Sequence, residues 1–137
     1  TGLPSIADDS GIEVDALNGQ PGIYSARYAG ENANDKDNLN LLLKNMQNQT
    51  NRAARFVCVI AFMRFELDPM PIICQATWEG TLLETPIGEG GFGYDPIFEV
   101  NELKKPSALL SKEEKNAISH RGQAIKLLLD RLKTMDI

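Results

Sequence analysis

Two acids and a hydroxyl lie near the amino end of the chain, at Asp8, Asp9 and Ser10. An alternating apolar run from Ile12 to Ala16 follows them, so we expect a half-buried strand that begins after a tight turn at these residues. Neighbouring carboxylates at a strand end can hold a metal ion and activate water. The same residue types also close turns through bonds to the backbone, and the pattern leaves both interpretations open.

The second candidate is the segment from Gly88 to Pro96, which holds four glycines within six residues. Glycines allow positive φ angles and close approach of the backbone to a ligand. Phe92 and Tyr94 provide flat rings on which a base can stack, and Asp95 adds a hydrogen-bond acceptor. The segment therefore predicts either a nucleoside pocket or a structural loop with two aromatic residues in the core.

The third candidate combines a lysine with the chain's one histidine and a neighbouring arginine, at Lys115, His120 and Arg121. On a continuous helix, Lys115 and His120 would point about 140° apart. They converge on one ligand only if the helix breaks, and Ser119 with Gly122 favours such a break. Arg121 near a helix start is suited to holding a phosphate or a carbonyl oxygen. A surface histidine without a ligand is the plainer alternative.

The elements that must position these residues indicate an α/β or α+β domain, since strands and helices alternate and one hairpin excludes a purely parallel sheet. We expect a single domain over residues 1–137. The expected elements are a helix capped by Asn34 or Asp35 with Leu39, Leu42, Leu43 and Met46 on one face, hairpin strands over Phe56–Phe65 and Ile72–Thr81, a strand over Ile97–Val100, a helix that starts at a capping box at Ser111, and a last helix with Ile125, Leu128, Leu129 and Leu132 on one face.

Composition and charge exclude several classes of protein. The 137 residues are 42% hydrophobic and 24% charged, which is typical of a globular domain and not of a disordered or collagen-like chain. A net charge of −5 argues against binding to nucleic-acid backbones. The longest apolar run, from Phe56 to Phe65, is interrupted by Arg64, so no membrane span is expected. Cys58 and Cys74 stand in apolar segments, which indicates buried thiols in a reducing cytoplasm.

Four segments together resemble the inosine triphosphate pyrophosphatase family, whose members hydrolyse non-standard purine nucleoside triphosphates. Each segment alone is a weak indication, but the four occur in the family's order and span nearly the whole chain. They are ADDSG at residues 7–11, PGIYSARY at 21–28, GGFGYDP at 90–96 and SHRG at 119–122.

The resemblance implies an elongated α/β fold with a nucleotide cleft between two lobes, a homodimer and dependence on Mg²⁺. It also implies the reaction, in which a nucleoside triphosphate and water yield the monophosphate and pyrophosphate. Carried over by position, Asp9 is the general base and a metal-associated carboxylate, with Asp8 beside it. The implied substrate-binding residues are Ser10, Phe92, Gly93, Tyr94, Asp95, Lys115, His120 and Arg121.

Hydrogen-bond donors at His120 and Arg121 would favour a base with an acceptor at its 6-position, such as hypoxanthine or xanthine. Adenine presents an amino group there, and two donors would face each other at a cost of about 1–3 kcal/mol. Guanine also has a 6-oxo group, so its rejection depends on the 2-position. We therefore expect inosine, deoxyinosine and xanthosine triphosphates as substrates.

The chain departs from the family at its amino end. Family members begin with a Thr/Ser-Gly-Asn-x-x-Lys segment that cradles the triphosphate, and they carry an upstream glutamate that helps to bind metal. Here Thr1-Gly2 runs into Leu3-Pro4, so we expect an N-terminally incomplete domain that lacks a strand and a helix, as a fragment of a longer enzyme. The alternatives are a non-catalytic nucleotide-binding module and a Maf-like pyrophosphatase that prefers modified pyrimidines.

Overall fold

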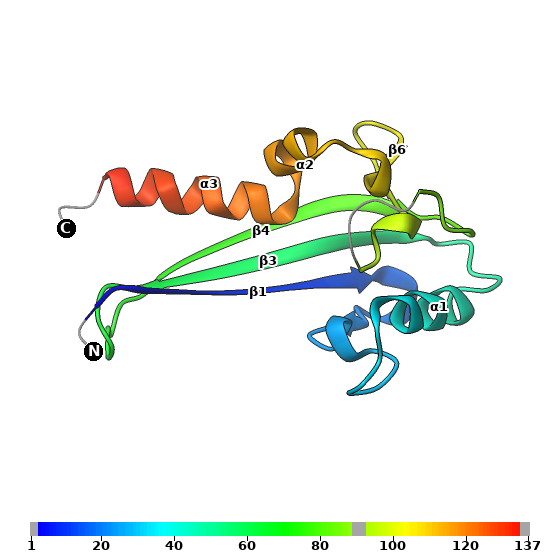
Figure 1. The fold of residues 1–137 in the computed structure, drawn as a ribbon, viewed down its shortest axis with the longest axis horizontal. Helices are drawn as coiled ribbons and strands as arrows, with labels where there is room; N and C mark the ends of the chain where they lie inside the picture. The colour runs from blue at the N-terminus through cyan, green and yellow to red at the C-terminus, as the bar shows by residue number, and fades with distance from the viewer. Residues whose placement is uncertain (1–2, 89–92, 135–137) are drawn as a thin grey trace.

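The computed structural model describes residues 3–88 and 93–134, and within them one sheet runs along the length of the molecule (Figure 1). Its strands are β1 (Ser5–Val14), β2 (Pro21–Gly22), β3 (Ala53–Met63), β4 (Ile72–Leu82), β5 (Phe98–Val100) and β6 (Lys105–Pro106). The strand order is β2-β1-β3-β4-β5-β6, and each pairing is antiparallel. The expected α/β class, with an elongated sheet and flanking helices, is confirmed.

β1 passes through Asp8, Asp9 and Ser10 as a continuous strand, so the predicted tight turn is wrong. Ser10 pairs with Cys58, and the ladder to β3 extends over the whole of β1. These ladder bonds satisfy the backbone groups that a turn would otherwise have to satisfy. Alternation along the strand sends Asp8 and Ser10 to one side and Asp9 to the other.

β3 and β4 form the predicted antiparallel hairpin, in which Phe56 lies opposite Trp78. The connection between the two strands is held by the Asp68 carboxylate. It accepts hydrogen bonds from the backbone and the guanidinium of Arg64 and from the backbone N–H of Met70. The Arg64 guanidinium above all holds the pKa of Asp68 well below its usual range. This turn therefore fixes one end of the long hairpin.

Helices α1 (Asp35–Asn45) and α3 (His120–Lys133) pack against the same face of the sheet, and α2 (Lys112–Ile118) leads into α3 (Figure 1). α1 forms a core cluster with the strand residues at one end, and α3 forms a second cluster with β3 and β4. The predicted burial of both thiols is confirmed, since Cys58 and Cys74 are free and buried in the second cluster. Burial raises the pKa of Cys58.

The first two helices begin where the sequence predicts. Asn34 caps α1 and Ser111 caps α2, each with a complete capping box. In α1 the apolar stripe faces the core, where Leu39, Leu42 and Met46 are buried. Local capping chemistry and helical periodicity therefore locate these elements correctly.

The apolar stripe predicted for the last helix is only partly right. Leu128 is buried and Leu132 partly buried against the sheet, whereas Ile125 and Leu129 are 41% and 53% exposed. Ala124 faces the sheet instead, one helical turn before Leu128. A small side chain at this position lets the helix approach the strands closely, and the larger neighbours then point away.

Candidate active site

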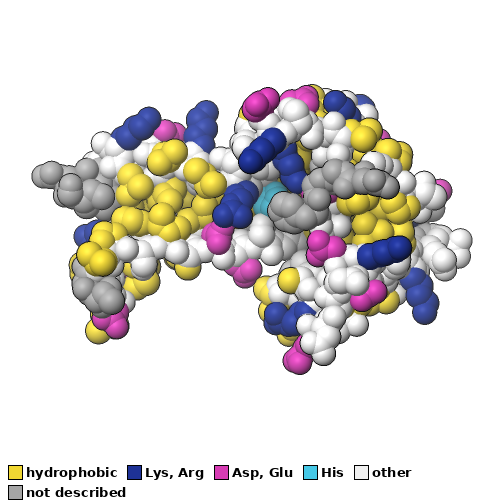
Figure 2. All heavy atoms as spheres, viewed as in Figure 1, with side chains coloured by type: hydrophobic (Ala, Val, Ile, Leu, Met, Phe, Trp, Pro, Cys, Tyr) yellow, Lys and Arg dark blue, Asp and Glu magenta, His cyan; other side chains and the backbone are white. Residues whose placement is uncertain are grey.

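A cleft lies beside the first residues of α3, partway along the sheet. Its inner part is a pocket of about 170 Å³, and a hollow of about 760 Å³ adjoins it. The two share Ser10, Lys115 and His120, and together they fall within the size range of small-molecule sites. Figure 2 shows the one imidazole recessed in this hollow with Lys and Arg side chains beside it.

The cleft brings together the three segments that the sequence identifies. The amino-end segment, the glycine-dense segment and the segment before the last helix all contribute to its walls. The contributing residues are Ser10, Gly93, Tyr94, Asp95, Lys115, His120 and Arg121. Phe92 lies outside the described residues. The two acids of β1 do not line the cleft, since Asp8 contacts Arg121 and Asp9 faces a different hollow.

The break between α2 and α3 directs Lys115 and His120 into the same cleft, as the sequence predicts. Ser119 ends α2 in an extended conformation and caps α3, and its hydroxyl accepts a hydrogen bond from the Gly122 N–H at 3.1 Å. A Cβ added at Gly122 would lie 1.9 Å from the Asn116 carbonyl oxygen. The corner between the helices is therefore tightly packed, and it fixes the direction of both side chains.

His120 lies at the base of the cleft against aromatic rings. Its ring stacks on Phe56, with centroids 4.9 Å apart, and lies 6.2 Å from Trp78. Burial lowers the pKa of His120 to about 4, against an opposing effect of Asp95, so the imidazole is neutral at pH 7. Its buried Nδ1 has no hydrogen-bond partner among the described residues. An unpaired buried nitrogen costs free energy that a ligand can recover.

Asp95 and Lys115 form an ion pair in the wall of the cleft. Lys115 Nζ donates to Asp95 Oδ2, and the two side chains are 19% and 3% exposed, respectively. The Ser107 hydroxyl donates to Asp95 Oδ1 at 2.7 Å. Next to this pair, the Tyr94 hydroxyl donates to the Ser25 carbonyl oxygen at 2.7 Å, and burial raises the pKa of Tyr94. These contacts hold the wall in place before any ligand binds.

The two acids of β1 have different surroundings. Asp8 Oδ2 lies 3.0 Å from Nη2 of Arg121, which lines the larger hollow. Asp9 accepts a hydrogen bond from the Ser10 N–H at 3.0 Å and faces a separate hollow that it shares with Glu13. Residues 3–88 and 93–134 contain no group of three His, Cys, Asp or Glu side chains that could hold a metal ion.

Comparison with known proteins identifies the family. The profile of the Ham1 family matches residues 1–131, almost the whole chain. The chain belongs to the Ham1 family.

Curated relatives of this Ham1 chain carry one common name. The dITP/XTP pyrophosphatase of Idiomarina loihiensis is 58% identical over 134 residues, which cover 96% of this chain and 66% of the relative. The dITP/XTP pyrophosphatase of Escherichia coli K12 is 56% identical over 135 residues, which cover 97% of this chain and 68% of the relative. The chain therefore spans about two thirds of the length of the curated relatives it matches.

Solved structures of the Ham1 family have the same fold. A HAM1 protein from Coxiella burnetii superposes with a TM-score of 0.94 at 48% identity, covering 98% of this chain and 70% of that one. A nucleoside-triphosphatase / dITP/XTP pyrophosphatase from Mycobacterium abscessus gives 0.78 at 41% identity, covering 96% and 67%. The resemblance drawn from the four sequence segments is confirmed.

The cleft of this Ham1 chain is also lined by residues that the sequence analysis did not identify as site residues, among them Asp35, Asn38 and Phe56. Asp35 Oδ2 accepts a hydrogen bond from the Gly93 N–H at 3.1 Å. Asn38 is buried, and its amide bonds the backbone of the loop before α1. A polar residue one turn before Leu42 in the apolar stripe is a sequence feature that indicates Asn38. Phe56 has no such feature, because its pattern is that of any core residue.

Proposed function

We propose that the protein hydrolyses the triphosphates of inosine, deoxyinosine and xanthosine to the monophosphate and pyrophosphate, and so removes them from the nucleotide pool. The observation that carries this proposal is the single cleft onto which Ser10, Asp95 and His120 all open. It combines aromatic surface with cationic side chains, as a purine nucleotide requires. The matched relatives bear the name dITP/XTP pyrophosphatase.

The neutral state of His120 supports a preference for 6-oxo purines. A neutral imidazole donates from one ring nitrogen only, and its buried Nδ1 is unpaired among the described residues. The 6-oxo group of hypoxanthine or xanthine accepts such a hydrogen bond, with Arg121 as a second donor. The amino group of adenine would oppose these donors, at a cost of about 1–3 kcal/mol.

Asp9 and Asp8 are the proposed carboxylates for Mg²⁺. Proteins hold this ion with one or two carboxylates together with substrate phosphate oxygens. Asp8 and Asp9 point to opposite sides of β1, so one ion would take one of these two carboxylates. Asp8 is already paired with Arg121, and Asp9 takes part in no ion pair with any residue that the structure describes. Asp9 is therefore the stronger candidate as the carboxylate ligand of Mg²⁺. When bound, Mg²⁺ neutralises charge on the phosphates.

The chain's own groups then position the nucleotide and move one proton. We propose Asp9 as the general base that takes a proton from the attacking water. Asp9 points to the opposite side of β1 from Ser10, so this role requires the triphosphate to pass the edge of β1 that β2 leaves unpaired at this residue. The water oxygen bonds to the α-phosphorus, the bond from that phosphorus to the bridging oxygen breaks, and pyrophosphate leaves with the electron pair. Lys115 and Arg121 offset the negative charge of the phosphates.

The test is a pyrophosphate-release assay on the protein at its natural length, with inosine triphosphate and Mg²⁺. Asp9→Asn keeps the side-chain shape but removes the base, and we expect the rate to fall by about 100-fold or more. Asp130→Asn serves as the control, because Asp130 is an exposed acid on α3 outside the cleft. Binding is followed separately by the fluorescence of Trp78, the only tryptophan in the chain.

The outcomes separate the alternatives. Nucleotide binding without pyrophosphate release in the wild-type protein identifies a non-catalytic binding module. Equal rates in the wild type and in Asp9→Asn refute the role of Asp9. Faster hydrolysis of modified pyrimidine triphosphates than of inosine triphosphate supports the Maf-like alternative.

We also propose a homodimer in the cytoplasm. Apolar side chains at Ile6, on the face of the sheet that α3 covers, and at Leu129 of α3 are 60% and 53% exposed, and such surface is suited to contact with a second copy. Two buried free thiols agree with a reducing compartment. Among the described residues no helix is both long enough and apolar enough to span a bilayer. Light scattering that gives the mass of one chain would refute the dimer.

A further inference from the structure

Ser107 lies just before α2, in the 3-10 turn Ser107–Leu109, and is 1% exposed. Its hydroxyl lies 2.7 Å from Asp95 Oδ1 and 3.3 Å from the Asp95 carbonyl oxygen. The Ser107 hydroxyl thus donates a hydrogen bond to one oxygen of the Asp95 carboxylate, and that side chain is itself 3% exposed. Hydrogen bonds to buried charged groups are among the stronger ones in proteins.

The other oxygen of the same carboxylate binds Lys115. Lys115 lines both the inner pocket and the larger hollow, so its ammonium stands where the two parts of the cleft meet. The contacts therefore form a chain from the Ser107 hydroxyl through Asp95 to Lys115. The Ser107 hydrogen bond to the second oxygen restricts rotation of the carboxylate about its terminal torsion.

We propose that Ser107 is a positioning residue of the nucleotide cleft, which orients Asp95 so that Lys115 is held at the junction of the two parts. The proposal rests on the proposed function, since it deepens the account of the same cleft. Ser107 need not touch the nucleotide, because its effect runs through two other side chains. Removal of the hydroxyl should leave the fold intact and weaken the hold on the lysine.

The test compares Ser107→Ala and Ser107→Cys with the wild type. The thiol is a weaker donor than the hydroxyl, and alanine is none, so the effects should rise in the order Ser, Cys, Ala. Ser111→Ala is the control, because it also removes a serine hydroxyl next to α2, where Ser111 caps the helix by accepting from the Glu114 N–H. Each variant is first shown to unfold cooperatively.

Two measurements are made on every variant. The dissociation constant for inosine triphosphate, followed by Trp78 fluorescence, should rise about tenfold in Ser107→Ala. Proton exchange of the Lys115 ammonium, followed by nitrogen NMR without nucleotide and assigned with Lys115→Arg, should become about tenfold faster. Both values should stay within about twofold of wild type in Ser111→Ala.

The second measurement separates this inference from the proposed function. If the wild type fails to bind the nucleotide but the exchange changes as expected, the proposed function fails, while the positioning of Lys115 by Ser107 through Asp95 stands. If Ser107→Ala leaves the exchange of Lys115 unchanged, the inference is overturned, whatever happens to binding. Changed exchange with wild-type nucleotide affinity also overturns it, because the lysine would then be held for no purpose in the cleft.

Discussion

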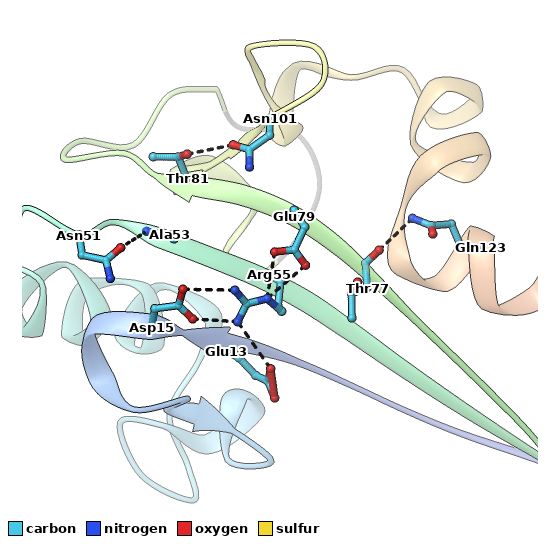
Figure 3. A network of polar contacts seen from close by, with 10 residues as sticks. All are labelled: Glu13, Asp15, Asn51, Ala53, Arg55, Thr77, Glu79, Thr81, Asn101 and Gln123. Atoms are coloured by element: carbon cyan, nitrogen blue, oxygen red, sulfur yellow. Dashed lines mark hydrogen bonds and ion pairs between the residues drawn. The ribbon is translucent and has the colours of Figure 1, made fainter.

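An ion pair on the cleft face of the sheet and a cluster of ion pairs around Arg55 on the opposite, open face differ in how far water reaches them. On the cleft side, Asp95 is 3% exposed and Lys115 is 19% exposed. On the other face Arg55 lies 3.0 Å from Glu79 and 2.9 Å from Asp15, and these carboxylates are 52% and 42% exposed (Figure 3). The same kind of contact thus occurs in two environments within one sheet.

The comparison indicates that the burial of an ion pair, more than the number of its partners, determines how much it contributes to the free energy of unfolding. Water and salt screen the charges around Arg55, and ordering long side chains costs entropy. In the cleft wall the effective dielectric is lower, so removal of one partner leaves an uncompensated charge. Hydrogen bonds to Asp15 and Glu79 raise the pKa of Arg55, but arginine is charged at neutral pH in any case.

The largest effect is expected for Asp95→Asn. This change leaves the Lys115 ammonium without the Asp95 carboxylate, and we expect the free energy of unfolding to fall by about 4 kcal/mol. Urea unfolding followed by circular dichroism measures it. Glu79→Gln on the open face is the control, with an expected loss several times smaller. Similar losses in both variants would contradict the distinction between the two faces.

The next effect is a pH dependence of the free energy of unfolding, and it comes from His120 in the cleft. Because the pKa of His120 is lowered to about 4 in the folded chain and is about 6.5 in the unfolded one, the unfolded state binds more protons between these values. Stability from this group is therefore present above pH 6.5 and is lost as the pH falls towards 4, by about 3 kcal/mol between pH 7 and pH 4.

Urea unfolding between pH 7 and pH 4 measures this loss, and His120→Gln isolates it because the variant lacks the titrating ring. Asp15 on the open face does not obscure the result. Its pKa is lowered from 3.8 by Arg55, so its contribution is lost only below that window. Equal pH dependence in the wild type and in His120→Gln would show that the imidazole titrates normally in the fold.

Much of the fold follows from the sequence because buried residues at regular spacing specify it. The hairpin and the stripe of α1 follow from periodicity, and Asn34 and Ser111 mark helix starts through local hydrogen bonds. The predicted turn at Asp8–Ser10 fails because its competitor is β3, a partner far away in the chain. Turn propensity is a local property, and the pairing that overrides it is not.

The sequence predicts the part of the candidate site whose residue types are themselves charged or reactive. Asp95, Lys115 and His120 are reactive or charged and flank breaks in the chain, so their convergence could be expected. Ser107 and Phe56 could not be singled out in this way. Their importance depends on which side chains the tertiary fold places beside them, and a buried serine or phenylalanine has no local pattern that states this.

The smallest effect is expected for Arg55→Met, which keeps the apolar stem and removes the charge on the open face. We expect a loss below about 1 kcal/mol that shrinks further between about 0.05 M and about 0.5 M NaCl, because salt screens exposed charges.

Arg52→Met is the matched comparison, since Arg52 donates to the carbonyl oxygens of Leu82, Leu83 and Met46 at 2.7–3.0 Å from a partly buried position. Its loss should exceed that of Arg55→Met and should not depend on salt, because partly buried carbonyl groups would lose a charged donor. If Arg55→Met costs as much as Arg52→Met at both salt concentrations, the open-face cluster is not screened and exposure does not distinguish the two faces.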